Sequence, residues 1–441
     1  MGLFRVTNFN FSSGTSTATS RSVHMTFWSD DDSFLLISNL NGKAIERINV
    51  IKDQTGKIIN LVFDRSATLG LGKGMTVAES AAVFSGLNEH GNQLIGTMGG
   101  DYALSDIQDL TPNGACKENG CPGGRNGDAG GRGNNLPICP IPSSTNKLYI
   151  TLAGGGLLVA DLATTPMSIV GEYGQAVVYG AGCGGAQVKN QMVLNAGVST
   201  SSAGATQSMF AVFSLDDDAF PRGQGSTINP ENTPMPIRIF QDEGNTQTGG
   251  NVEGIKGVSD NSGQKPGVST RRDSHGAAVH PNKMYVYVVD RIQNIVEVFH
   301  STTYERSSFD LVSRSGQTGR AGPSSACYSK SVLDDAKLAL DDPAPDLADI
   351  TPDGKYMMVA LRGPAPVSVS HSAQGSCPGV GIVELLDNGK TGRLVGVIRT
   401  TNTISDALTI TESTIAGGVA YAGSERSDVH QVTVIPKRAK N

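Results

Sequence analysis

The chain has 441 residues, a formal net charge of −6, only 17% charged residues and 55 glycines without the fixed period of collagen. Apolar residues at 38% are enough to build a core, which excludes global disorder. The mildly acidic balance, without a stripe of Lys and Arg, argues against a nucleic-acid partner. We therefore expect a soluble, turn-rich and β-rich protein.

The first residues, MGLFRVTNFNF, contain neither an apolar core segment nor a small-residue cleavage site, so they do not resemble a signal peptide. No apolar run approaches the roughly 20 residues that span a bilayer, so we expect no membrane span.

Three segments share one pattern of strand, polar turn and strand: residues 24–50, 275–299 and 346–370. Their turns supply the Asn, Asp, Gly and Pro that tight hairpins need. A looser copy covers residues 138–162. Weaker hairpin signals near 78–108, 176–215 and 405–435 bring the expected number of units to seven.

Repeated antiparallel units of three or four strands predict a β-propeller, because one sheet cannot bury both of its faces alone. We therefore expect an all-β fold, a single β-propeller domain over residues 1–441 with seven blades of four antiparallel strands. Long Gly-rich insertions are expected near 112–137, 241–272 and 302–345, the last with a short helix near 331–340.

Three of these segments resemble YVTN-type β-propeller repeats: SDDDSFLLISNLNGKAIERINV, HPNKMYVYVVDRIQNIVEVF and TPDGKYMMVALRGPAP. The family pattern is a Pro-Asp/Asn-Gly-Lys turn followed by a YVTN-like strand. Here the turns are Ser29-Asp30-Asp31, Pro281-Asn282-Lys283 and Pro352-Asp353-Gly354, and in two segments an alternating apolar strand follows. The resemblance implies a propeller of the broad group that includes lactonase-like enzymes, cofactor-bearing propellers and binding proteins. It implies no particular function, because a shared fold does not carry one.

Aligning the repeats places certain polar residues at equivalent positions. His24, His275 and Asp346 open the innermost strand of their units, and neighbouring antiparallel strands begin and end at the same rim. We therefore expect one ligand-binding rim around a central channel. Its predicted residues are His24, Asn39, Arg272, His275, Asp290, Asp346 and Arg362.

Four of these residues form a predicted site for a divalent metal, either Ca²⁺ or a transition metal: His24, His275, Asp290 and Asp346. The same groups could instead act as general acids and bases, or simply pair with Arg362 or Arg272. No Glu occupies the equivalent rim position that a lactonase-like site would need, so we predict no catalytic residue. His280 is expected to cap the hairpin turn before Pro281.

Six cysteines are present, and none forms the paired C-x-x-C arrangement of a zinc site. Each lies near Pro, Gly or Ser in apparent loop sequence, which favours disulfides and a secreted or extracytoplasmic location over free thiols in a reducing compartment. The cysteines are Cys116, Cys121, Cys139, Cys183, Cys327 and Cys377.

The leading hypothesis for function is a non-catalytic binding or assembly module that contacts a protein partner, further copies of itself or a small ligand through the rim and the enlarged loops. The alternative is a lactonase-like, metal-dependent hydrolase or isomerase that acts at the channel. A haem-carrying electron-transfer propeller is disfavoured, because the chain has no C-x-x-C-H attachment motif.

Overall fold

The computed structural model describes about half of the chain. The described ranges are 20–21, 23–40, 42–71, 96–97, 135–153, 155–174, 177–178, 182–197, 210–222, 233–242, 273–291, 294–311, 343–363, 378–400 and 428–435.

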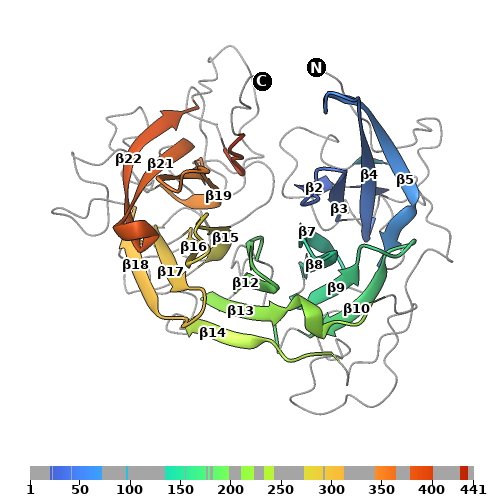
Figure 1. The fold of residues 1–441 in the computed structure, drawn as a ribbon, viewed down its shortest axis with the longest axis horizontal. Coiled ribbons are helices and arrows are strands. Elements are labelled where there is room, and N and C mark those ends of the chain that lie inside the picture. Colours follow the sequence, from blue (N-terminus) through green and yellow to red (C-terminus); the bar gives the residue numbers. More distant parts are fainter. Residues whose placement is uncertain are drawn as a thin grey trace, which may run out of the picture. The chain divides into compact units, whose positions relative to one another are not determined.

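The described residues form five four-stranded antiparallel sheets, each made of strands consecutive in the chain (Figure 1). Sheet 1 contains β2 (Val23–Trp28), β3 (Phe34–Asn39), β4 (Ala44–Lys52) and β5 (Ile58–Gly70). Sheet 2 contains β7 (Pro137–Pro142), β8 (Lys147–Leu152), β9 (Leu157–Asp161) and β10 (Ser168–Tyr173). Sheet 3 contains β11 (Gly185–Val188), β12 (Gln191–Gly197), β13 (Phe210–Asp216) and β14 (Ile237–Asp242).

Sheet 4 contains β15 (Ser274–Val279), β16 (Tyr285–Asp290), β17 (Ile295–His300) and β18 (Arg306–Asp310). Sheet 5 contains β19 (Pro345–Ile350), β20 (Tyr356–Leu361), β21 (Gly379–Leu386) and β22 (Thr391–Arg399). A two-stranded pair joins β1 (Ser20–Arg21) to β6 (Gly96–Thr97), and two short 3-10 turns cover Asp217–Ala219 and Asp387–Gly389.

This architecture confirms the predicted class, an all-β fold of the β-propeller type, because each sheet is the four-stranded antiparallel meander of a propeller blade. The count of seven blades stays a prediction, since the described residues supply five sheets. The part of the chain that the structure describes contains no helix that could cross a membrane.

The first hairpin turn repeats closely in four of the sheets. In sheets 1, 4 and 5 the turn closes with a backbone hydrogen bond of 2.9 Å, as from Ser29 N to Phe34 O. The fourth residue of each turn takes the left-handed backbone conformation that Asn, Asp and Gly adopt most readily. These residues are Asp32 (φ 55°), Asn146 (φ 62°), Lys283 (φ 61°) and Gly354 (φ 70°).

His280 caps the turn of sheet 4, as predicted. Its Nδ1 accepts a hydrogen bond from the backbone N–H of Asn282 at 3.3 Å, and its Nε2 lies 3.1 Å from the carbonyl oxygen of Gly354 in the adjacent sheet.

The inner strands share a one-residue β-bulge near their start. In sheet 1 the register shifts between Val23 and Thr26, and in sheet 4 between Ser274 and Ala277. The same shift occurs in sheets 2 and 5, from Pro137 to Pro140 and from Pro345 to Ala348. A bulge re-aims the side chains beside it. The residues at the equivalent bulge position are His24, Ile138, His275 and Asp346.

The chain separates into two compact units. Unit 1 comprises residues 1–181, 189–192 and 215–237; unit 2 comprises 182–188, 193–214 and 238–441. Sheets 1 and 2 belong to unit 1, sheets 4 and 5 to unit 2, and the strands of sheet 3 contribute to both. The prediction of one domain over residues 1–441 stays a prediction.

Each unit has its own apolar core between neighbouring sheets. In unit 1, Leu36 and Ile45 of sheet 1 pack with Leu148 and Leu158 of sheet 2. In unit 2, one cluster joins sheets 4 and 5 around Tyr287 and Met357, and another packs residues of sheet 3 against sheet 4. These clusters bury apolar side chains from two neighbouring sheets at once, which stabilises the packing of one sheet on the next.

Several sequence predictions lie outside the described residues. These are most of the insertions at 112–137, 241–272 and 302–345, the helix near 331–340, the hairpin signal at 78–108 apart from β6, and most of the signal at 405–435.

Candidate functional site

Asp346 lies at the centre of a buried polar cluster in unit 2. It comes from the bulge of β19, where the extra residue turns the side chain toward neighbouring β15. Its side chain is fully buried. Its Oδ2 lies 2.9 Å from Arg362 and 3.8 Å from Arg291, so two guanidinium groups face one carboxylate oxygen.

Each of these arginines also binds a second carboxylate. Arg362 contacts Asp428 Oδ2 at 2.7 Å, and Arg291 contacts Asp273 Oδ2 at 2.8 Å. Both arginine side chains are buried, and charges at such depth are tolerated only when they are paired. Asp346, Arg291 and Arg362 therefore form one continuous ion-pair network with Asp273 and Asp428.

Two histidines complete the cluster. His275, from the bulge of β15, contacts Asp346 Oδ1 through its Nδ1, and His430 Nδ1 lies 2.9 Å from Asp346 Oδ2. The two imidazole rings are stacked, with centroids 5.5 Å apart. The carbonyl of His430 accepts from Leu347 N at 3.3 Å, which fixes the segment 428–430 against β19.

Burial and charge set the protonation of the cluster. Burial and then the neighbouring Arg291 lower the pKa of His275 to about 3, so its imidazole is neutral at pH 7. Burial alone would raise the pKa of Asp346, but the two histidines and two arginines outweigh it and hold that pKa well below its usual value. The cluster thus combines an ionised carboxylate with a neutral imidazole.

The structure brings together three of the predicted rim residues: His275, Asp346 and Arg362. Asp290 of β16 pairs with Ser274, the residue before His275 in β15. Its Oδ1 accepts a hydrogen bond from the backbone N–H of Asp273 at 3.3 Å. Its placement therefore supports the start of β15. Arg272 lies outside the described residues.

The other two predicted rim residues, His24 and Asn39, belong to unit 1. His24 donates from Nδ1 to the backbone oxygen of Ile138, at 3.1 Å. Asn39 accepts from the backbone N–H of Gly42 at 2.9 Å and donates to Glu46 at 3.2 Å, so its side chain closes the turn between β3 and β4. The participation of His24 and Asn39 in a shared ligand site stays a prediction.

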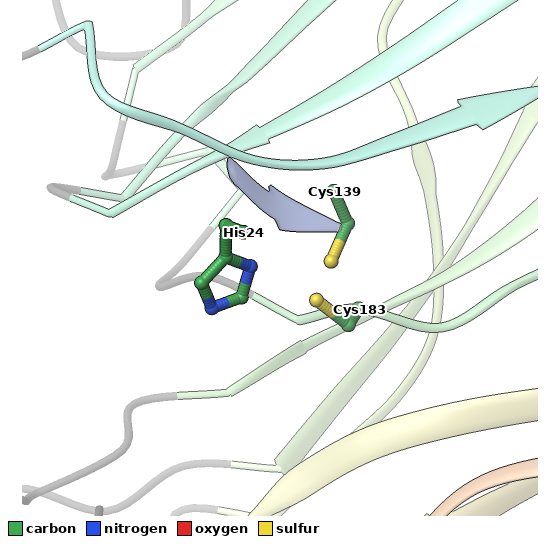
Figure 2. A group of neighbouring side chains, drawn as sticks. All are labelled: His24, Cys139 and Cys183. Carbon is green, nitrogen blue, oxygen red and sulfur yellow. The ribbon is translucent and has the colours of Figure 1, made fainter. Parts of the chain in front are cut away.

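Figure 2 shows three further potential ligands, His24 and Cys139 of unit 1 and Cys183 of unit 2. Both cysteines are disulfide-bonded, and a disulfide sulfur carries no thiolate to bind a metal. This agrees with the prediction of disulfides, although Cys139 lies in strand β7 rather than in a loop.

Three members of the cluster were not predicted from the sequence: His430, Asp428 and Asp273. Asp428 and His430 precede a short alternating run, QVTVI, like the runs that follow the polar residues of the clear repeats. That resemblance is the only signal that could have identified them, because their partners are distant in the chain.

Comparisons with known proteins give a weak likeness. A scan against protein-family models gave no match, and a search of curated proteins gave none. A Bacteroides fragilis structure provisionally named as a 6-phosphogluconolactonase is 11% identical, with a TM-score of 0.35 over 86% of this chain and 73% of that one. The calcium-binding protein regucalcin from Agrobacterium tumefaciens is 8% identical, with a TM-score of 0.34 over 87% and 76%.

The β-propeller domain of Cps50 (Swd1) from Myceliophteria thermophila is 10% identical, with a TM-score of 0.34 over 78% of this chain and 80% of that one. Identities and scores this low carry no argument about the activity or ligands of this chain. Its function has to be argued from its own residues.

Proposed function

We propose that this chain is a non-catalytic scaffold of the β-propeller class that assembles with further copies of itself through apolar residues on its outer strands. The observation that carries the proposal is the exposure of β5, the outer strand of sheet 1.

Strand β5 presents large apolar side chains to solvent. Ile58, Ile59 and Val62 are 45%, 60% and 42% exposed, and Ile51 on the neighbouring strand β4 is 42% exposed. Among the described strands β5 pairs only with β4, so its other edge offers backbone N–H and C=O groups. A long apolar edge of this kind is a template for pairing with another strand.

Other outer strands show that this exposure is not a general property of the fold. Strand β18 is polar at Arg306, Ser307 and Ser308, as expected for an edge that faces water. Strand β10 is buried along its whole length.

Strand β22 of sheet 5 resembles β5. Its Val395 and Ile398 are 46% and 58% exposed, and among the described strands it pairs only with β21. Among the described strands, β5 and β22 thus form an apolar outer edge in each unit. Two edges allow one copy to contact two others, which is the requirement for an extended or closed assembly. We therefore expect the partner at each edge to be a second copy of this chain.

The buried cluster in unit 2 supports a structural rather than a catalytic use of its charges. The Asp346 carboxylate is held by Arg362 and His430, and both arginines are paired with further carboxylates. The metal-dependent hydrolase or isomerase predicted as an alternative would need groups that a substrate can reach, whereas Asp346, Arg291 and Arg362 are buried. The disulfide-bonded state of Cys139 and Cys183 supports an extracytoplasmic location for the scaffold.

The test is sedimentation velocity of the full chain over a range of concentrations, on the wild type and on Ile59→Lys and Ile398→Lys. We expect the wild type to associate and each lysine variant to weaken association at least tenfold, because each loses about 1.5–3 kcal/mol of apolar burial and adds a charge. Ser308→Lys on β18 is the matched control and should associate like the wild type. A wild type that stays monomeric, or lysine variants that associate normally, would refute the proposal.

A further inference from the structure

The second inference concerns His275, Asp346 and His430, and it is independent of association through the outer strands. One ligand atom from each of these side chains lies within 4.8 Å of the other two. They come from β15, β19 and the segment 428–435, which are far apart in the chain and meet only in the folded unit 2.

Two atoms of this group are buried and lie directly against each other. His275 Nδ1 and Asp346 Oδ1 form a close polar contact, and neither atom has a further hydrogen-bond partner among the described residues. A bound cation would satisfy both atoms at once, because each offers it a lone pair.

The remaining contacts of Asp346 and His275 hold these two atoms in fixed directions, as the hydrogen bonds around a metal site hold its ligands. Asp346 uses Oδ2 for Arg362 and His430, which leaves Oδ1 directed at His275. Asn195 donates from its side chain to the backbone oxygen of His275 and holds the start of β15 in place. Hydrogen bonds of this outer kind fix the direction of ligating groups in metalloproteins.

The donor set selects the class of metal. Two imidazoles and one carboxylate suit Zn²⁺ and related divalent transition ions, whereas Ca²⁺ takes six to eight oxygen ligands. A metal binds imidazole in its neutral form and carboxylate in its ionised form, so Zn²⁺ binding at such a set is expected to weaken as the pH falls.

We infer that His275, Asp346 and His430 form a binding site for a divalent transition metal, Zn²⁺ by preference, that ties β15, β19 and the segment 428–435 together. This site differs from the set predicted from sequence, since it includes His430 and uses neither His24 nor Asp290. Its role is structural: the ion binds the folded state and thereby stabilises it.

The experiment is a titration of the EDTA-treated full chain with ZnCl₂, followed by calorimetry and by thermal unfolding. We expect one equivalent of Zn²⁺ to bind and excess Zn²⁺ to raise the Tm by at least about 2 °C. Two variants test the ligands, His275→Gln and His430→Gln. Each should lower the Zn²⁺ affinity at least tenfold and remove the rise in Tm.

His300→Gln is the matched control, because His300 lies in the same sheet as His275 and its Nδ1 accepts from the backbone N–H groups of Thr302 and Thr303 in a surface turn. It should bind Zn²⁺ like the wild type. His430→Gln leaves both arginine–carboxylate pairs intact, and its own Tm without metal shows whether it folds. A wild type that binds no Zn²⁺, or folded His275→Gln and His430→Gln variants that bind it unchanged, would overturn the inference without affecting the outer-strand proposal.

Discussion

Each unit contains a pair of neighbouring inner strands, β2 with β7 in unit 1 and β15 with β19 in unit 2. The two pairs share a backbone geometry but differ in the groups that meet between the strands. Both pairs carry the same bulge, and in both a histidine faces the equivalent residue of the next strand. His24 reaches the backbone oxygen of Ile138, which also accepts from Ser38 Oγ at 2.6 Å. His275 instead meets the carboxylate of Asp346.

One side chain therefore decides the character of each strand pair. Where Ile138 offers its carbonyl, that oxygen accepts hydrogen bonds from His24 and Ser38. Where Asp346 offers a carboxylate, burial requires compensating charges, which Arg291 and Arg362 supply. A single substitution should therefore lower the free energy of unfolding more in the strand pair that contains Asp346 than in the pair that contains Ile138.

The largest expected effect comes from Asp346→Asn in metal-free buffer. The variant leaves Arg291 and Arg362 buried beside a neutral group, so we expect a loss of about 3–5 kcal/mol in the free energy of unfolding. Urea denaturation measures this loss. The partner experiment is His24→Ala, which removes the hydrogen bond to the backbone oxygen of Ile138 in unit 1 and should cost about 1 kcal/mol. Equal costs for the two variants would show that the two strand pairs do not differ as described.

A smaller effect is expected from Gly276→Ala, which tests how closely β15 approaches β19. A Cβ at Gly276 would lie 2.3 Å from the backbone oxygen of Asp346, whereas the equivalent position of sheet 1 holds Met25. Displacing β19 should cost about 1–3 kcal/mol, measured by urea denaturation.

Gly396→Ala on β22 is the control for Gly276→Ala, since the nearest atom to its added Cβ is 3.8 Å away. We expect no loss of stability for the control. A Gly276→Ala variant as stable as that control would contradict the close approach of the two inner strands.

The smallest expected effect concerns the first hairpin turn, whose residues differ between sheet 1 in unit 1 and sheet 4 in unit 2. In sheet 1, hydrogen bonds from Ser33 and Ser29 lower the pKa of Asp31 from 3.8 to about 2; in sheet 4, His280 takes the place of Ser29. A depressed folded-state pKa gives stability above pH 3.8 that is lost as the pH falls toward 2. The stability difference between wild type and Asp31→Asn should therefore shrink over that range, as followed by denaturation at each pH.

Asp30→Asn is the control for Asp31→Asn, because Asp30 lies in the same turn and makes no side-chain hydrogen bond to the described residues. A difference for Asp31→Asn that stays constant from pH 4 to pH 2 would rule out the role given to its carboxylate.

The sequence by itself determined the local parts of this protein. The turns were recognisable because Asp32, Asn146 and Gly354 suit a left-handed backbone position, a property of single residues. The repeated alternation of polar turn and apolar strand indicated four-stranded antiparallel sheets, and the alignment of repeats placed His275 and Asp346 at equivalent positions. Each of these inferences depends on neighbours within one hairpin.

Only the tertiary structure decided how those positions are used. His430 and Asp346 are 84 residues apart, and nothing in the local sequence of either shows that they meet. The pairing of Arg291 and Arg362 with Asp346 likewise depends on which strands lie side by side and on a one-residue bulge. The physical reason is that backbone conformation responds to adjacent residues, whereas buried charges respond to every group that folding brings within a few ångströms.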